Sequence, residues 1–461
     1  GAAAFFNVAF RTAEPFQAVS ADPSTITDAA WWRDRLQGNA LAAGDISELF
    51  AIVDFAKLRR GERDDSAVPK TGAFNRIHAS RFERKQGADF TASCLGAPAN
   101  CPGQYMGQLQ PYAIYVPDRP RPAEGWGLTL LLHSLSANYN QYSGTANQSQ
   151  FGERGPGSIV VTPEGRGPDG FYENYGAADT FEVWADVARR YRLDPDWTVA
   201  AGYSMGGIGS FKLAAQFPDL FARIQPTVGS EGDTAVLASL RNVPVHMWNN
   251  HGDELVNNAS FTETANALAD LGYRYQLDAF QPCLNAGCSP ITPNHLQLAI
   301  NDQYAPMAEF LGTHEVDRNP ARVTYVLFGA RNHPELGVVG DHAYWVSGLK
   351  LREGADRGTI DARSHAFGVG DPAATATSGS GTLEGGRLGN LLFTSQGMTW
   401  GEAPATERAD RLDVEATGLT AARIDMKRAG LTCDAEVRVN STDGPLTVTL
   451  GGCQGKTVSS S

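Results

Sequence analysis

Between residues 105 and 312, short apolar runs alternate with stretches whose apolar residues recur at helical spacing. Because continuously apolar strands must be covered on both faces, this alternation predicts an α/β fold, a mostly parallel sheet flanked by helices. One domain of about 200 residues is expected here. The expected strands are 113–116, 128–133, 159–162, 198–202, 243–248 and 273–280. The expected helices are 179–192, 205–216, 260–271 and 302–311.

Two further zones flank this region. Residues 1–104 form a mixed N-terminal extension, in which FFNVAF alternates like a strand and 27–60 shows helical spacing. Residues 313–461 consist of short alternating segments separated by turn residues, which predicts a C-terminal β domain resembling a β-sandwich. Within it, residues 368–388 are rich in Gly, Ser and Thr, and we expect a long loop or a hinge there.

The segment WTVAAGYSMGGIGSFKLAAQ places Gly202, Ser204 and Gly206 in a G-x-S-x-G motif. An apolar strand enters the motif and a helix leaves it. A serine that projects above a sheet needs a sharp turn, and the residues two before and two after it must be small. The helix start also directs free N–H groups at developing negative charge. The motif therefore predicts that Ser204 is a nucleophile, with an ordinary glycine-rich turn as the alternative.

The sequence GYSMGG following LDPDW resembles the α/β-hydrolase superfamily. It is most similar to the secreted esterase branch, which includes relatives of feruloyl esterases and polyhydroxyalkanoate depolymerases, and to the related catalytic domains of prolyl oligopeptidases. The resemblance covers about residues 105–312. It implies a catalytic triad in the order Ser, acid, His, an acyl-enzyme intermediate, and no metal or organic cofactor.

The resemblance also implies an oxyanion hole built from two backbone N–H groups. One belongs to Met205, which follows the nucleophile. The other should come from the loop after the strand that ends at His133, where Leu135 is expected and Ser134 is the near alternative. Relatives usually carry His-Gly at the position where this chain has His133 and Ser134.

Polar residues of the same loop are candidates for contact with a substrate. We expect Ser134, Asn138 and Tyr139 to line the cleft, with a solvated loop as the alternative for each.

The acid of the triad is expected at Asp253, which follows an apolar strand in VPVHMWNNHGDELV. A carboxylate at that strand end can orient a histidine and stabilise its imidazolium form. Glu254 is the neighbour most easily confused with it, and a helix N-cap is the alternative role for Asp253.

The base is expected at His295, because relatives place it where the last strand is followed by the last helix. His342, in VVGDHAYWVSG, has an aspartate beside it, and His333 lies in RNHPELG; both fall in the zone assigned to the β domain. His246 and His251 flank the acid strand and are expected to be structural.

The six cysteines fall into neighbouring pairs. Other connectivities and six reduced thiols remain open, but nearest-neighbour disulfides would indicate secretion into an oxidising compartment. The spacings do not match zinc sites. The expected pairs are Cys94 with Cys101, Cys283 with Cys288, and Cys433 with Cys453. Because GAAAFFNVAF lacks a charged n-region, we expect that any secretion signal has already been removed.

The formal net charge of −13 disfavours nucleic acid and anionic lipid as partners. No apolar run reaches the roughly 20 residues of a spanning helix, so membrane insertion is not expected.

The leading hypothesis is therefore an extracellular serine hydrolase that cleaves carboxylic esters, either plant-wall esters or polyesters. One alternative is a peptidase of the prolyl-oligopeptidase type, although the first zone is too short for the β-propeller of such enzymes. Another is a protein that binds polymers through an aromatic strip of Tyr344, Trp345 and Trp400, with burial in a core as the simpler explanation.

Overall fold

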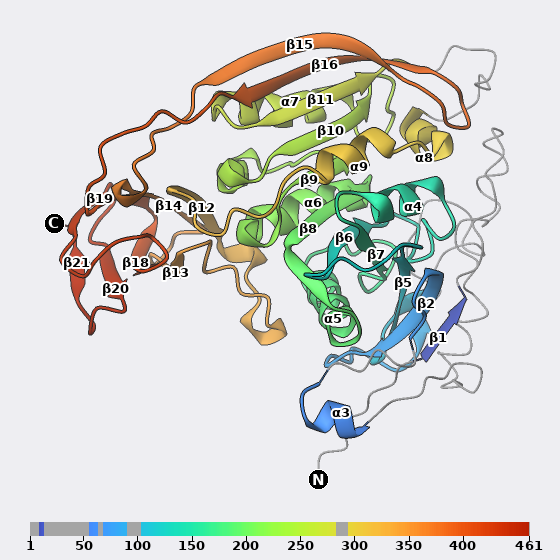
Figure 1. Ribbon diagram of the computed structural model, residues 1–461, viewed down its shortest axis with the longest axis horizontal. Coiled ribbons are helices and arrows are strands. Elements are labelled where there is room, and N and C mark those ends of the chain that lie inside the picture. The colour runs from blue at the N-terminus through green and yellow to red at the C-terminus, as the bar shows by residue number, and fades with distance from the viewer. Residues whose placement is uncertain (1–8, 13–54, 63–67, 90–102, 283–293, 461) are drawn as a thin grey trace.

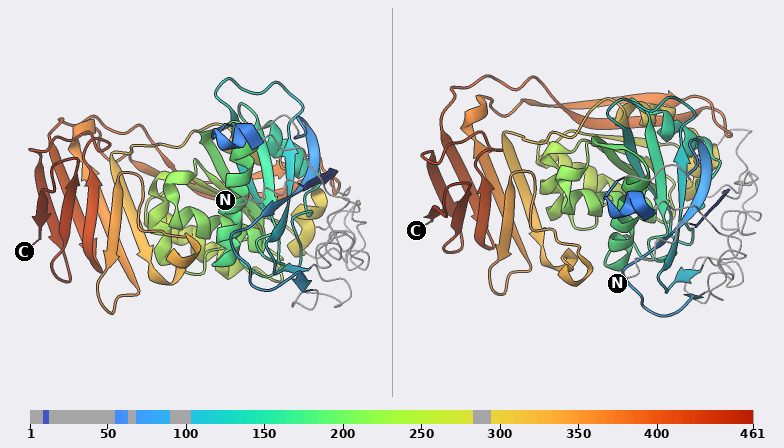
Figure 2. Two further views of the ribbon diagram at one scale, coloured as in Figure 1. Left: turned by 90° about the horizontal axis from the view of Figure 1, so that it is seen from below. Right: turned by 60° about the horizontal axis from the view of Figure 1, so that its bottom comes forward.

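The computed structural model describes residues 9–12, 55–62, 68–89, 103–282 and 294–460. Their elements form one large sheet with helices on both faces, and two smaller sheets toward the C-terminus (Figures 1 and 2). The predicted fold class, an α/β hydrolase with an added β domain, is confirmed.

The large sheet has 11 strands. Its central six, which are β7, β6, β8, β9, β10 and β11 in spatial order, run parallel. In spatial order the strands are β1 (Ala9–Thr12), β2 (Gly72–Ala79), β5 (Leu109–Val116), β7 (Ser158–Pro163), β6 (Trp126–Leu132), β8 (Leu193–Tyr203), β9 (Ile224–Thr227), β10 (Val245–Asn250), β11 (Tyr275–Phe280), β16 (Leu391–Trp400) and β15 (Ala374–Leu383). All six expected strands are confirmed. The short strand β9 was missed.

Helices cover both faces of this sheet because alternate strand residues point to opposite sides. On β6, Leu130 packs into the core that includes Phe211 of α6, whereas Leu131 packs into the core that includes Phe151 of α4. The helices are α3 (Phe55–Arg59), α4 (Ala146–Glu153), α5 (Tyr175–Arg190), α6 (Met205–Gln216), α7 (Asn258–Asp270), α8 (Gln297–Asn301) and α9 (Ala305–Leu311). The expected helix 302–311 is interrupted at its start, where Asp302 has a φ of 50°.

Short elements connect these parts. They are β3 (Ala88–Asp89) and β4 (Gln104–Tyr105), and the 3₁₀ turns η2 (Pro218–Leu220), η3 (Thr234–Asn242), η4 (Asn294–Leu296), η5 (Gly329–Arg331), η6 (Pro334–Leu336) and η7 (His365–Phe367). Within the described residues, no helix combines the length and the apolar character that crossing a membrane requires.

The C-terminal β domain consists of two four-stranded sheets that share one apolar core. One sheet contains β12 (Arg322–Phe328), β14 (Arg357–Ser364), β17 (Arg411–Thr417) and β19 (Glu436–Ser441). The other contains β13 (Val346–Leu351), β18 (Leu419–Asp425), β20 (Thr447–Gly451) and β21 (Thr457–Ser459). Tyr344 and Trp345 are buried in this core, and Trp345 donates its indole N–H to Pro320 O, so these two rings form no exposed strip.

The expectation of a loop or hinge at residues 368–388 was wrong. The chain leaves the β domain, forms β15 and β16, and returns (Figure 1). β16 pairs antiparallel with β11, from Tyr275 opposite Met398 to Phe280 opposite Phe393. These strands therefore extend the large sheet, although the sequence places them inside the C-terminal zone.

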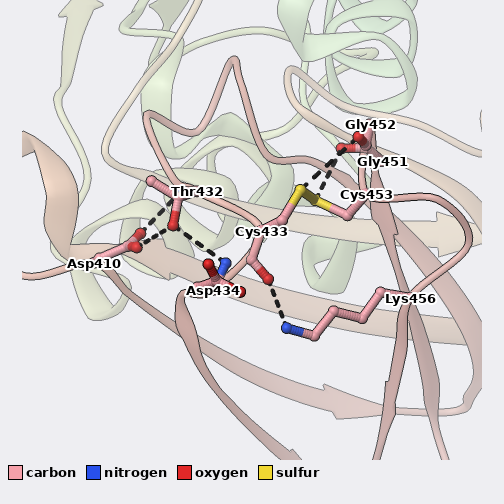
Figure 3. Close-up of a disulfide and its surroundings, with 8 residues drawn as sticks. All are labelled: Asp410, Thr432, Cys433, Asp434, Gly451, Gly452, Cys453 and Lys456. Atoms are coloured by element: carbon pink, nitrogen blue, oxygen red, sulfur yellow. Dashed lines mark hydrogen bonds between the residues drawn. A yellow bond between two sulfur atoms is a disulfide. The ribbon is translucent and has the colours of Figure 1, made fainter.

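The pair Cys433–Cys453 forms the predicted disulfide (Figure 3). Cys433 precedes β19 in one sheet of the β domain and Cys453 follows β20 in the other, so the bond links the two sheets. Lys456 Nζ donates to the Cys433 carbonyl at 2.6 Å beside it. The other two predicted pairs, Cys94 with Cys101 and Cys283 with Cys288, lie outside the described residues, as does most of the expected helical stretch 27–60.

Candidate active site

Ser204 occupies the turn between β8 and α6 with φ 55° and ψ −115°. A non-glycine residue in this region is strained by about 1–3 kcal/mol, and such strain persists only where the surroundings hold it. The Ser204 N–H donates to Thr227 O of β9 at 2.9 Å, which fixes the turn against the neighbouring strand. The residue is 9% exposed, so access to its hydroxyl is restricted.

The glycines of the motif allow β6, β8 and α6 to approach closely. A Cβ on Gly206 would lie 1.9 Å from Leu132 O at the end of β6. A Cβ on Gly202 would lie 2.4 Å from the backbone of Gly206 itself. Any side chain at either position would push the helix away from the sheet and move the serine with it.

His295 lies between Ser204 and Asp253. Its Nε2 is 2.9 Å from Ser204 Oγ, and its Nδ1 is 2.8 Å from Asp253 Oδ2. The side chains of His295 and Asp253 are 5% and 0% exposed, so this chain of contacts is shielded from water. The three residues selected from the sequence thus lie in hydrogen-bonding contact, in the order that a serine, a base and an orienting acid require.

The loop after β10 holds the Asp253 carboxylate. Its Oδ1 accepts the backbone N–H groups of Leu255 and Val256, each at 2.8 Å. Two N–H donors on one oxygen fix the direction of the carboxylate. Glu254 has a different partner, because its Oε2 accepts the His295 backbone N–H at 3.1 Å.

Sequence reasoning missed Tyr203 as a contributor to the site. Its hydroxyl donates to His295 O, so the histidine backbone is held by Glu254 on one side and by Tyr203 on the other. Burial raises the pKa of Tyr203 well above its usual value, which keeps the hydroxyl protonated as a donor. Its position next to Ser204 is visible in the sequence, but its reach to residue 295 is not.

The N–H groups of Leu135 and Met205 have no acceptor within the part of the chain that the structure describes. The alternative donor, the Ser134 N–H, is occupied by Gln141 Oε1 at 2.6 Å. The Ser134 hydroxyl also accepts from Gln141 Nε2 at 2.8 Å. Gln141, which was not singled out from the sequence, therefore holds Ser134 and leaves Leu135 free.

His133 supports the same loop. The ring nitrogens of His133 lie 2.9 Å from the carbonyl oxygens of Ser134 and Glu164. The Tyr172 hydroxyl donates to the backbone carbonyl of His133 at 3.2 Å. Burial lowers the pKa of His133, while the two carbonyl oxygens oppose that shift.

Asn138 and Tyr139 do not line an open cleft, contrary to expectation. Both are 0% exposed. The Asn138 side chain accepts the Asn140 N–H at 2.9 Å, and the Tyr139 ring packs edge-on against Tyr105. Side chains without accessible surface cannot contact a substrate in this conformation, so these two residues shape the loop instead. Ser134 is 9% exposed.

The other candidate histidines bond elsewhere. His342 and His333 contact the neighbouring carboxylates Asp341 and Glu335 at 3.2 and 3.4 Å. His246 Nε2 lies 2.7 Å from Asp278 Oδ2, and His251 faces Asn258 at 3.1 Å. In the described ranges, no group of three or more His, Cys, Asp or Glu side chains is arranged to hold a metal ion.

The chain from residue 104 to residue 265 matches the protein family described as "Putative esterase". Over this region the chain is similar to that esterase family. The matched segment contains β5 to β10, the Ser204 turn and Asp253, whereas His295 lies beyond it. A sequence comparison with curated proteins found no significant match.

Several solved structures are similar to part of the chain. A thermostable esterase shares 19% identity with a TM-score of 0.40, over 45% of this chain and 60% of its own length, which is less than two thirds. A ferulic acid esterase shares 17% identity with a TM-score of 0.32, over 38% and 84% of the two chains. S-formylglutathione hydrolase from Staphylococcus aureus shares 18% identity with a TM-score of 0.32, also over 38% and 84%.

Proposed function

We propose that this chain hydrolyses carboxylic esters with Ser204 as nucleophile, His295 as general base and Asp253 as orienting acid. The observation that carries the proposal is the position of the His295 ring, with Nε2 at 2.9 Å from Ser204 Oγ and Nδ1 at 2.8 Å from Asp253 Oδ2. In this arrangement the acid selects the tautomer whose Nε2 lone pair accepts the serine proton.

The reaction proceeds in two halves. His295 takes the proton of Ser204 as Oγ attacks the ester carbonyl, and the resulting imidazolium is stabilised by Asp253. The imidazolium then protonates the departing alcohol, which leaves an acyl-enzyme. In the second half His295 activates a water molecule in the same way, and Ser204 is released with its proton restored.

The backbone N–H groups of Leu135 and Met205 stabilise the oxyanion of both tetrahedral intermediates. Among the described residues neither N–H has another acceptor, which supports this role, since a donor committed to another bond could not serve it. The Ser134 N–H is excluded by its bond to Gln141. Loss of one such donor typically costs about 3–4 kcal/mol of transition-state stabilisation.

The Cys433–Cys453 disulfide supports the inference that the protein works in an oxidising compartment outside the cytoplasm. We therefore place the ester substrate outside the cell, and plant-wall esters and polyesters are the classes to test first.

The deciding experiment compares initial rates on p-nitrophenyl butyrate and on a proline p-nitroanilide peptide, using the wild-type chain and Ser204→Ala. We expect ester cleavage by the wild type alone and no anilide cleavage by either protein. Preferential cleavage of the anilide would contradict the proposed esterase function and favour a peptidase. Full activity of Ser204→Ala would contradict the assignment of Ser204 as nucleophile.

A further inference from the structure

A cleft of about 540 Å³ lies between the hydrolase sheet and the β domain. Its walls come from residues just before β9 and β11, from the end of β16 and from the start of β12. Ser204 follows β8 at its carboxyl end, whereas Arg274 directly precedes the parallel strand β11. The cleft therefore lies at the amino-terminal ends of the parallel strands, whereas Ser204 lies at their carboxyl ends. The two sites are separated by about one strand length, or ~20 Å.

The lining of this cleft is positively charged, although the whole chain carries a net charge of −13. Four arginines line it against two aspartates. The arginines are Arg223, Arg241, Arg274 and Arg322, and the aspartates are Asp317 and Asp371.

In the part of the chain that the structure describes, no carboxylate is in direct contact with Arg274. Its guanidinium lies 4.4 Å from the ring centroid of Trp400, and its Nε is buried without a hydrogen-bond partner. Within the described residues the Arg274 side chain forms no hydrogen bond and no ion pair, although the charge of Asp317 acts on it. Burial lowers the pKa of Arg274, as expected for a cation held partly out of water.

Arg223 faces the same cleft, and no carboxylate of the described residues pairs with it. Its guanidinium lies 4.4 Å from the centroid of the Phe310 ring, donates to Phe310 O at 2.7 Å, and contacts His314 Nδ1. Its Nε is also buried without a partner. Burial and the nearby charge of Arg274 lower the pKa of Arg223 to about 10, so the two cations repel each other.

Within the described residues, neither carboxylate of the cleft forms an ion pair with Arg223 or Arg274. Asp371 already binds three guanidinium groups, those of Arg241, Arg322 and Arg363. Asp317 accepts the Asn319 N–H at 3.1 Å and forms no ion pair within the described residues.

We propose that this cleft binds a small organic oxyanion, a carboxylate or a phosphate, between Arg223 and Arg274. Two partly buried guanidinium groups that repel each other destabilise the empty protein, and an anion placed between them would remove that cost. The guanidinium fork matches the oxygen pairs of carboxylate and phosphate groups. The rings of Trp400 and Phe310 hold the two guanidinium groups at the cleft by cation–π contacts. The cleft volume lies in the usual range for small-molecule sites.

The test is calorimetric titration of the Ser204→Ala chain at low ionic strength with citrate, inorganic phosphate and, as an uncharged control, sorbitol. We expect binding of citrate, phosphate or both, and none of sorbitol. Arg274→Met and Arg223→Met should each weaken binding roughly tenfold or more, since each removes charged hydrogen bonds while keeping an apolar stem. The matched control is Arg438→Met, which replaces an exposed arginine of the β domain and should bind as the parent does.

Thermal melting separates a binding site from a structural one. Arg274→Met should keep or raise the melting temperature without ligand, because it removes one of two repelling cations, whereas a structural arginine would lower it. Ester hydrolysis in the Ser204-containing Arg274→Met chain should be unchanged, so the fate of this site is independent of the catalytic proposal. Equal affinity for sorbitol, no anion binding, or undiminished binding in both methionine variants would overturn the assignment.

Discussion

Asp253 and Glu254 are sequence neighbours that hold different parts of His295. Asp253 faces the ring nitrogen Nδ1, and Glu254 accepts the backbone N–H. The contact with Asp253 affects the tautomer and the charged form of the imidazole ring. The contact with Glu254 fixes only the position of the His295 backbone. The two carboxylates should therefore differ sharply in their effect on the rate.

We predict that Asp253→Asn lowers kcat about 10⁴-fold, because an amide favours the wrong imidazole tautomer and cannot stabilise imidazolium. Glu254→Gln should lower it by less than about tenfold, since glutamine keeps a carbonyl oxygen for the His295 N–H. Steady-state kinetics on p-nitrophenyl butyrate, with circular dichroism to confirm folding, measure both. A larger loss in Glu254→Gln than in Asp253→Asn would exchange the two roles.

The close approach at Gly206 gives a second prediction at this scale. Gly206→Ala should destabilise the protein by about 3 kcal/mol or more and abolish hydrolysis, because its methyl group would overlap Leu132 O. Gly232→Ala is the matched control, since no atom lies within 4 Å of its Cβ position. Urea denaturation compares them, and a stable, active Gly206→Ala chain would contradict the contact.

Among the elements, the β15–β16 ribbon has the least expected position. It comes from the C-terminal zone but covers the edge of the sheet at β11, where Phe393 meets Phe280 with ring centroids 5.2 Å apart. β15 is exposed over most of its length, so it has no buried face to produce an alternating apolar pattern.

Phe393→Ala should lower the free energy of unfolding by about 2–3 kcal/mol, because it leaves a gap beside Phe280. Leu392→Ala, one residue earlier on the same strand and 59% exposed, should stay within about 0.5 kcal/mol of the wild type. Urea denaturation followed by esterase activity would report both values. Equal losses in the two variants would mean that the ribbon does not pack on the sheet through Phe393.

On the scale of the whole molecule, the linear order of the chain does not separate the hydrolase from the β domain. We propose that the division into residues 1–104, 105–312 and 313–461 be amended, with residues 374–400 assigned to the hydrolase unit because they form two strands of its sheet. The Arg241–Asp371–Arg322 contacts further join η3 of the hydrolase to the first strand of the β domain.

A chain that ends at residue 312 should therefore fail to give soluble, active enzyme. The deletion removes β15 and β16 and exposes the backbone edge of β11, which is a template for aggregation. Size-exclusion chromatography and esterase assays against the full chain test this. A soluble truncated chain with full activity would show that the ribbon is dispensable.

The sequence by itself determined the parallel core, the Ser204 turn, the Cys433–Cys453 pair and the C-terminal β domain. These features follow from local signals, namely apolar periodicity, glycine spacing and short cysteine separation. It also led to Asp253 and His295, although through chain order in similar proteins rather than through geometry.

Tertiary structure alone decided the rest. The pairing of β16 with β11 joins segments more than 100 residues apart, and no local pattern encodes it. The roles of Gln141 and Tyr203, and the burial of Asn138 and Tyr139, depend on which loops meet above the sheet. The arginine cleft forms because separate elements bring their cations together at the amino-terminal ends of the parallel strands. The order of charges along the sequence does not show which of them will be close in the folded protein.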